Sequence, residues 1–174
     1  MCIEKNKKLG EKNLEIQAIK KYLEKHQVEQ LPVDNLDLSN SQSDIKYMDE
    51  PEIYNNIKRR DLSEELYEIE YQHGFMYLNS NQCDDLFEKL YILEENIINN
   101  SANEKLLHLY KLWHEIQEKR EYEMISNIYK YSYEHTYNKG LFLVGAGHRK
   151  SIIDKIQEYE KKNRLKLNWN YNIY

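Results

Sequence analysis

Glycine and proline are scarce in this 174-residue sequence, which contains five glycines and two prolines. Three of the five glycines lie close together, at Gly140, Gly145 and Gly147. Glycine adopts tight-turn geometry more readily than any other residue, so its clustering marks the place where the chain must turn sharply. The stretch that organises the rest of the chain is therefore 140–154, GLFLVGAGHRKSIID.

Cysteine, excess charge and long apolar runs are also lacking. The two cysteines, Cys2 and Cys83, form no CxxC or other metal-binding spacing and indicate a reducing compartment, which predicts a cytoplasmic protein. The formal net charge of −5 argues against a general nucleic-acid binder, which is usually basic. No apolar run is long enough to span a membrane, and MCIEKNKKLGEKN has no apolar core of a signal peptide. The predicted partners thus include neither nucleic acid nor a membrane.

What is present is a strand–turn–helix pattern at the glycine cluster. The apolar run 141–144 is short and bounded by glycines, which favours a buried strand over a helix. Ser151, with Asp154 three residues later, resembles a capping box and predicts a helix over about 151–162.

Apolar alternation and helical periodicity predict the remaining elements. Two further strands are expected, VEQLPV at 28–33 and LKLNW at 165–169, the latter pairing beside 141–144 through a right-handed crossover. Helices are expected at 10–27, 51–60, 61–72, 84–99 and 102–135, with a loop over 75–82. These elements predict a single helix-rich α/β domain over 1–174, with a small, partly parallel sheet of about three strands and a helical insertion at about 51–138.

His148 is the first candidate for chemistry. In an open α/β sheet, ligands bind at the carboxyl ends of the strands, next to helix N-termini. His148 would lie at such a junction, where it could bind a metal or move a proton; the alternative is an exposed histidine in a tight turn. GAGHRKS also shares part of the phosphate-loop pattern, but the glycine before the lysine is absent and the loop is one residue short. An anion could still bind here at the helix N-terminus, on Gly145, Gly147, Arg149 and Lys150.

Arg120 is the second candidate. Trp113, Ile116, Arg120 and Met124 are spaced by three, four and four residues, which places the arginine on the apolar stripe of the helix 102–135. A charge at such a position is costly unless it is paired. Arg120 is therefore either held inside the fold to meet a carboxylate or an oxyanion, or engaged in a structural ion pair, or reaching water from the edge of the stripe.

Together, these residues resemble the carboxyl-terminal part of the TraB/Tiki-like superfamily, whose relatives include erythromycin esterases and haem-uptake ChaN-like proteins. The similarity lies in REYEM at 120–124, followed after sixteen residues by an apolar strand and a G-x-G-H motif, here Gly145, Gly147 and His148. A weaker similarity covers the helix before VEQLPVD, this segment with its final Asp34, and the basic cluster at 58–60.

The resemblance implies a metal-dependent hydrolase or protease site built from two motif histidines, a glutamate and an arginine. The family's first G-x-x-H strand and its glutamate strand have no counterpart here, so the sequence resembles the portion that follows them. Only Arg120 and His148 can be carried over. The resemblance implies that His148 is a metal ligand or general base, and that Arg120 stabilises an oxyanion or orients a carboxylate. A divalent metal is the implied cofactor, although such a metal normally has three protein ligands and the sequence supplies fewer.

Two hypotheses follow. In the first, the chain is the carboxyl-terminal portion of a TraB/Tiki-like hydrolase, inactive alone and completed by an amino-terminal partner segment. In the second, it is a non-catalytic α/β interaction protein that pairs with a partner, or with a second copy as a homo-oligomer, through an incomplete sheet. Convergence of Arg120 and His148 on one open cavity would favour the first. Pairing of Arg120 with Asp34, with His148 facing bulk water, would favour the second. A helix-rich anion binder using Arg149 and Lys150 ranks below both.

Overall fold

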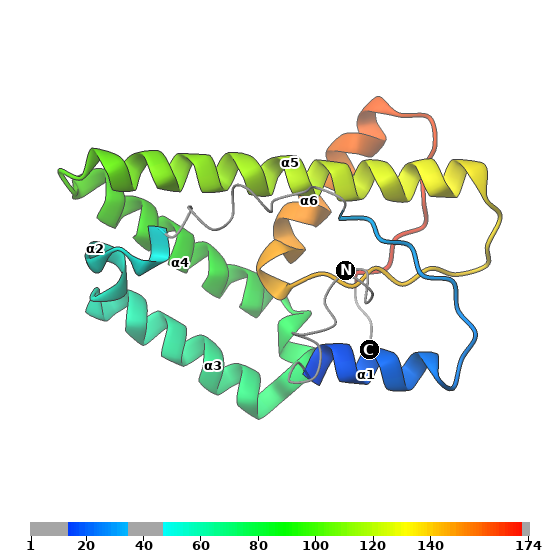
Figure 1. Ribbon diagram of the computed structural model, residues 1–174, viewed down its shortest axis with the longest axis horizontal. Coiled ribbons are helices and arrows are strands. Elements are labelled where there is room, and N and C mark those ends of the chain that lie inside the picture. The colour runs from blue at the N-terminus through cyan, green and yellow to red at the C-terminus, as the bar shows by residue number, and fades with distance from the viewer. Residues whose placement is uncertain (1–13, 35–46, 172–174) are drawn as a thin grey trace.

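The computed structural model describes residues 14–34 and 47–171, and these residues are predominantly helical (Figure 1). The elements, in chain order, are α1 (Leu14–Leu23), the 3-10 turn η2 (Tyr47–Asp49), α2 (Pro51–Tyr54), α3 (Ile57–Leu78), α4 (Asn81–Asn100), α5 (Glu104–Glu134), the 3-10 turn η3 (Ala146–His148) and α6 (Arg149–Lys162). No helix in these ranges is both long enough and apolar enough to cross a membrane.

The long helices α3, α4 and α5 follow one another closely in the chain. Each begins after a polar residue whose side-chain oxygen accepts a hydrogen bond from a backbone N–H of the first turn, at Asn56, Ser80 and Asn103. Helices α3 and α4 pack as a hairpin, and α6 packs against the carboxyl-terminal half of α5 (Figure 1). The turn η3 contacts both α4 and α6, which places His148 where three elements meet.

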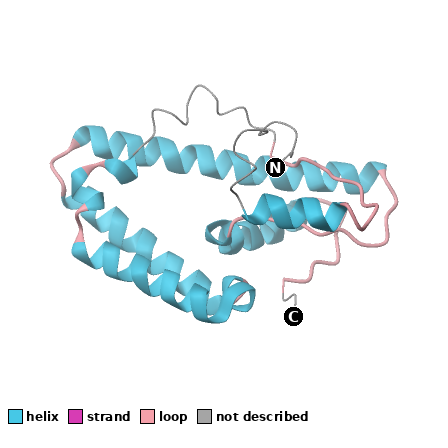
Figure 2. Ribbon diagram, turned by 60° about the horizontal axis from the view of Figure 1, so that its bottom comes forward, coloured by secondary structure: helices cyan, strands magenta, loops and turns pink. Residues whose placement is uncertain are grey.

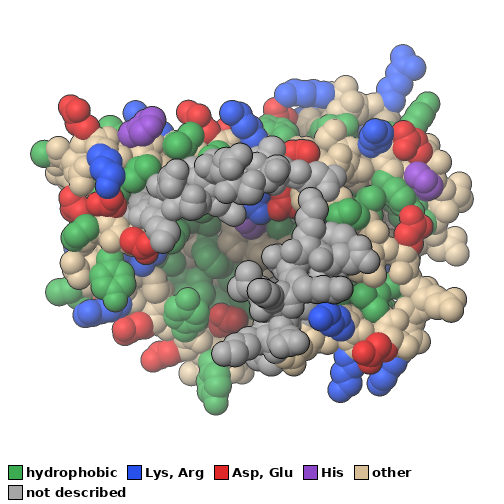
Figure 3. Space-filling view, viewed as in Figure 1, with side chains coloured by type: hydrophobic (Ala, Val, Ile, Leu, Met, Phe, Trp, Pro, Cys, Tyr) green, Lys and Arg blue, Asp and Glu red, His purple; other side chains and the backbone are tan. Residues whose placement is uncertain are grey.

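The apolar core is divided among three small clusters. The first joins α5 to α6, the second joins α2, α4 and α5, and the third joins α3 to α4. The first cluster lies closest to the glycine motif and consists of Met124, Ile125, Tyr129, Ile152 and Ile156. Charges of both signs are interspersed over the face seen in Figure 3.

The three-stranded sheet is not found in the described residues, so the predicted α/β class is wrong (Figure 2). Segments 28–34, 141–145 and 164–171 have no regular secondary structure. No backbone–backbone hydrogen bond joins these segments within 14–34 and 47–171. A sheet is defined by such a ladder, so apolar alternation alone does not make one.

The alternation itself is real, and its physical cause is packing on helices. Phe142 and Val144 are half-buried against the cluster between α5 and α6, whereas Leu141 and Leu143 between them are exposed. The segment 165–171 alternates in the same way. A segment can therefore show alternating burial of its side chains when every second side chain packs against helices, without a neighbouring strand.

The helix boundaries also differ from those expected. The chain does break near His73 and Gly74, but as a kink within α3, since Gly74 has φ 56° and ψ −135°. The loop expected over 75–82 is wrong, because α3 continues to Leu78 and α4 begins at Asn81. The helix expected over 10–27 is observed as α1, and residues 10–13 lie outside the described ranges.

Gly74 supplies a stability test of this kink. Its backbone angles belong to a region that is nearly exclusive to glycine, and a Cβ there would meet no atom within 4 Å. Gly74→Ala should therefore lower the free energy of unfolding by about 1–2 kcal/mol through backbone strain alone. Urea denaturation measures this loss, with Gly140→Ala, whose Cβ would make only an ordinary 3.5 Å contact, as the control. A Gly74→Ala variant as stable as this control would contradict the kink.

Candidate functional site around Glu121 and His148

The candidate site lies where the first turns of α6 face the middle of α5. His148 ends η3, and Ser151 and Lys155 follow it after three and seven residues, so the three side chains lie on one face of the turn and helix. Glu121 faces them from α5. Glu121 lies on the buried side of that helix, four residues after the buried Gln117 and three before Met124.

The Glu121 carboxylate is the centre of this cluster. Its Oε1 lies 2.6 Å from Nδ1 of His148. Its Oε2 accepts a 2.5 Å hydrogen bond from the Ser151 hydroxyl and lies 3.0 Å from the Lys155 ammonium. Lys155 also donates to the Ser151 hydroxyl at 2.8 Å. Both carboxylate oxygens are therefore occupied by groups from the next element.

These contacts fix the protonation of the cluster. Burial tends to raise the pKa of Glu121, but the hydrogen bonds from His148, Ser151 and Lys155 outweigh it and bring the pKa below its ordinary value. An ionised carboxylate only accepts hydrogen bonds, so Nδ1 of His148 must be the protonated, donating nitrogen. In the neutral ring this leaves Nε2 with the free lone pair. The His148 side chain is 26% exposed, so it is neither sealed in the core nor open to bulk water.

Arg120 is turned to different partners. It forms an ion pair with Asp34, with Nη2 and Oδ2 2.6 Å apart, and it donates to the Gln117 amide oxygen at 2.7 Å. No hydrogen bond or ion pair joins Arg120 to His148 within the ranges described. The structural ion pair considered from the sequence is thus present, and it ties α5 to the segment 28–34.

The residues expected to bind an anion face α4. Arg149 is paired with the buried Asp84, whose pKa is raised by burial against the opposing effect of the arginine. Lys150 contacts Glu88 at 2.5 Å. Gly145 is extended, and Gly147 approaches α4 so closely that a Cβ would lie 3.1 Å from the Tyr91 hydroxyl oxygen. Both cations therefore already contact carboxylates.

The capping role expected for Ser151 is wrong. Helix α6 begins at Arg149, immediately after His148, which makes no side-chain capping bond. Ser151 lies inside the first turn, and its hydroxyl donates across to Glu121. A serine near the start of a helix can thus either cap that helix or bond to another helix, and the sequence pattern does not distinguish the two.

The residues do not fit a divalent metal. Within 14–34 and 47–171, no group of three histidine, cysteine or carboxylate side chains converges in a way that could hold one. His148 is a single potential ligand, and the oxygens of the neighbouring Glu121 are engaged. Three protein ligands are the usual minimum for a catalytic zinc site.

Sequence reasoning missed Glu121, Lys155 and Asp84. Glu121 lies next to Arg120, the residue that the spacing of apolar side chains places on the stripe. The informative signal is the pair Gln117 and Glu121, two polar residues four apart that precede the apolar Met124. If the buried stripe of the helix is drawn through Gln117, Glu121 and Met124, one position away from Ile116 and Arg120, it identifies the Glu121 carboxylate as buried.

Comparison of the chain with protein-family models, with curated proteins and with solved structures finds no match.

Glu121 supplies a pH-dependent stability test. Glu121→Gln removes the charge that three donors share, so the free energy of unfolding at neutral pH should fall by about 2–3 kcal/mol. The folded-state pKa of Glu121 is depressed, so its contribution is complete above the ordinary value of 4.5 and is lost as the pH falls below it. The stability difference between the wild-type protein and Glu121→Gln should therefore shrink from pH 5 to about pH 3.

Chemical denaturation at several pH values measures that difference. The exposed Glu118, on the same helix, provides the control Glu118→Gln, which should cost little at any pH. A Glu121→Gln deficit that stays constant across this pH range would show that the carboxylate charge does not hold α6 to α5.

Proposed function

We propose that this chain is the carboxyl-terminal portion of a hydrolase domain of the TraB/Tiki-like type, that His148 is its general base, and that it is inactive without a further segment. The observation that carries this proposal is the 2.6 Å contact between Nδ1 of His148 and the buried Glu121 carboxylate. A carboxylate that orients a histidine in this way is the arrangement found where an imidazole moves protons.

The chemistry follows from the fixed tautomer. With its proton on Nδ1, the neutral ring can accept a proton from a water molecule at Nε2, and Glu121 then stabilises the imidazolium that forms. Ser151 and Lys155 keep Glu121 ionised for this task. Ser151 bonds to Glu121, so the cluster is not arranged as a serine nucleophile activated by His148.

Other parts of the site have to come from elsewhere. Arg120 could stabilise an oxyanion only if its contact with Asp34 opened. The described residues do not make a metal site, so no step of the proposed chemistry passes through a metal. These two limits are the reason for proposing that the chain does not turn over alone.

The tautomer of His148 provides the direct test. Nitrogen-15 NMR of the imidazole should show Nδ1 protonated and Nε2 unprotonated when the ring is neutral, and Glu121→Gln should weaken this preference. Peptide and ester hydrolysis and metal content are measured in parallel, beside His148→Ala. We expect neither turnover nor stoichiometric metal in the wild-type chain. An Nε2–H tautomer would overturn the role of general base, and turnover lost in His148→Ala would overturn the proposed inactivity.

A second candidate function, that of a non-catalytic interaction protein, is favoured by the segment 141–144. Its backbone makes no hydrogen bond to another segment within the described residues, and its Leu141 and Leu143 side chains are exposed. The pairing of Arg120 with Asp34 also points toward a structural role for the arginine. An extended backbone with free N–H and C=O groups can accept an added strand from a partner or from a second copy.

Proline at 143 tests this second function. Leu143→Pro removes an N–H that makes no backbone hydrogen bond in the described structure, and Phe142 before it lies outside any helix, so stability should change little. Sedimentation equilibrium should show that the wild-type chain self-associates and that Leu143→Pro weakens the association by about tenfold or more. The matched variant Leu141→Ala separates loss of apolar area from loss of the backbone donor. Equal association of the wild-type and proline variants would exclude strand pairing between copies at this segment.

The reducing, cytoplasmic compartment belongs to the same proposal. Cys83 is a free, buried thiol in α4, and burial raises its pKa to about 11. A thiol with so high a pKa stays protonated and is a poor nucleophile. Cys83 therefore acts as an ordinary packed side chain.

A further inference from the structure

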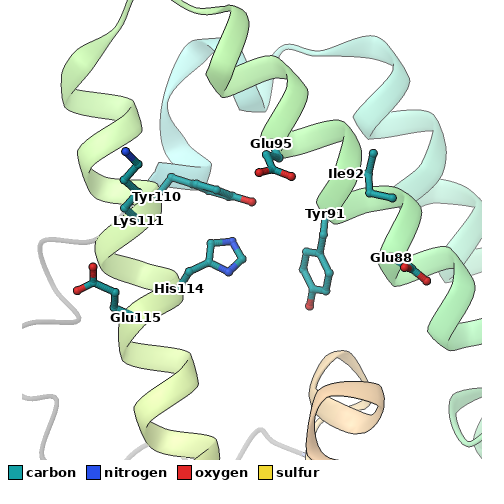
Figure 4. A pocket seen from close by; sticks show the side chains of 8 residues that line it. All are labelled: Glu88, Tyr91, Ile92, Glu95, Tyr110, Lys111, His114 and Glu115. Carbon is teal, nitrogen blue, oxygen red and sulfur yellow. The ribbon is translucent and has the colours of Figure 1, made fainter. Parts of the chain in front are cut away.

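A groove between α4 and α5 is lined by side chains that neither proposed function uses. Its volume is about 440 Å³, within the size range of small-molecule sites. One face of α4 and one face of α5 supply the lining, which consists of Glu88, Tyr91, Ile92, Glu95, Tyr110, Lys111, His114 and Glu115. Figure 4 shows Tyr91 on α4 facing Tyr110 and His114 on α5 across the groove, with Glu95 beside them.

The wall of the groove is aromatic. The His114 ring is the common neighbour of three others: its centroid lies 4.2 Å from that of Tyr110, 4.9 Å from that of Trp113 and 6.4 Å from that of Tyr91. All three contacts are edge-on, so ring faces and edges point in several directions around the space. Aromatic faces carry negative potential and attract cations that come within about 6 Å of the ring centre.

The rim of the groove is acidic. Three carboxylates, Glu88, Glu95 and Glu115, line it against one ammonium group, that of Lys111. Glu88 contacts Lys150, whereas Glu95 and Glu115 form no ion pair or hydrogen bond with any residue described. The excess charge of the lining is negative, and within 14–34 and 47–171 the charges of Glu95 and Glu115 are not engaged.

The remaining polar groups of the groove are neutral at physiological pH. Burial raises the pKa of Tyr91 and of Tyr110 to about 12, so both phenols keep their protons. Burial lowers the pKa of His114, so its ring does not add a positive charge that would repel a cation. The Nε2 atom of His114 is buried and has no hydrogen-bond partner among the described residues, so this ring forms part of the wall and does not belong to an internal network.

We propose that the groove between α4 and α5 binds a small organic cation, specifically an alkylammonium group, against Tyr91 and Tyr110 with its charge opposite Glu95 and Glu115. The combination of ring faces, an apolar side chain at Ile92 and carboxylates without an ion pair among the described residues selects a ligand that is both positively charged and partly apolar. An inorganic divalent cation would need converging oxygen ligands, and no such group of three is found in the described ranges. The carboxylates exclude an anion. This inference does not depend on the role proposed for His148.

Choline and its uncharged isostere 3,3-dimethylbutanol are the probes that test the proposal. Their shapes match, so the difference between them isolates the charge. Titrations are followed through the aromatic NMR signals of Tyr91 and Tyr110 and through the fluorescence of Trp113, which lies beside His114. Choline should bind about tenfold more tightly than the isostere, as expected for a cation at aromatic and carboxylate groups. A parallel titration with N-acetyl-lysine N-methylamide shows whether an ammonium group on a lysine side chain is also accepted.

Four variants locate the binding. Tyr110→Leu removes a ring and should weaken choline binding by about tenfold, and Glu95→Gln removes an exposed charge and should weaken it by about threefold. The controls lie on α5, outside the groove: Tyr133→Leu, which removes an exposed ring, and Glu118→Gln, which removes an exposed charge. Neither control should change the affinity.

Three results would overturn the proposal. Equal affinity for choline and dimethylbutanol would make the groove a purely apolar surface. Saturable binding of acetate, with none of choline or of the lysine derivative, would reverse the sign of the ligand. Absence of saturable binding of either cation in a protein whose circular dichroism shows it to be folded would mean that the groove is not a cation site. Binding of the lysine derivative but not of choline would retain the ammonium class and assign its source to a lysine side chain.

Discussion

The arrangement of the glycine motif depends on one buried carboxylate. Glu121 is almost fully buried in α5, and three groups from the next elements, His148, Ser151 and Lys155, bind its two oxygens. A buried carboxylate that lost these partners would carry a large desolvation cost, so α6 must begin where its first turns can reach α5. This requirement determines the start of α6, the tautomer of His148 and the displacement of Ser151 from a capping position into the first turn. The apolar cluster between α5 and α6 adds buried apolar area, but it does not by itself fix how α6 is aligned along α5.

Ion pairs also connect the other junctions, and two of the three carboxylates, Glu94 and Asp84, are buried, whereas Asp34 is partly exposed. Arg59 on α3 is 2.6 Å from the buried Glu94 on α4, Arg149 on α6 is paired with Asp84 on α4, and Arg120 on α5 is paired with Asp34. A core divided into three small clusters leaves neighbouring helices free to slide unless something directional fixes them. Ion pairs whose carboxylates are buried contribute little net stability compared with apolar packing, but a mispaired arrangement leaves a charge unsatisfied and is strongly disfavoured. The ion pairs therefore determine the alignment of the helices more than they increase the stability of the fold.

The sequence allowed prediction of those features that depend on local chemistry. The periodicity over 84–99 and 102–135 located α4 and α5 to within a few residues, because an apolar stripe on a helix is readable without knowledge of its partner. The predicted sheet was wrong because a strand must pair with a second backbone. The apolar pattern from Leu141 to Val144 is the same whether these side chains pack in a sheet or, as here, against helices. Glu121 was missed for a related reason. The local pattern of Gln117 and Glu121 can mark the buried side of the helix, but the donors that stabilise the carboxylate lie 27 and 30 residues further along the chain, at His148 and Ser151, and that pattern does not identify them.

Tyr91 connects the two sites that the structure suggests. Its ring forms one wall of the groove between α4 and α5, while its hydroxyl donates a 3.2 Å hydrogen bond to the carbonyl oxygen of Gly147, the residue before His148. A larger residue than glycine at 147 would press on that same hydroxyl. The glycine motif and the groove therefore share a side chain, and the position of the Tyr91 ring couples the width of the groove to the turn that presents His148. The scarcity of glycine in this chain has a physical meaning here: Gly147 is needed because the backbone must approach α4 closely enough for one phenol to serve both places.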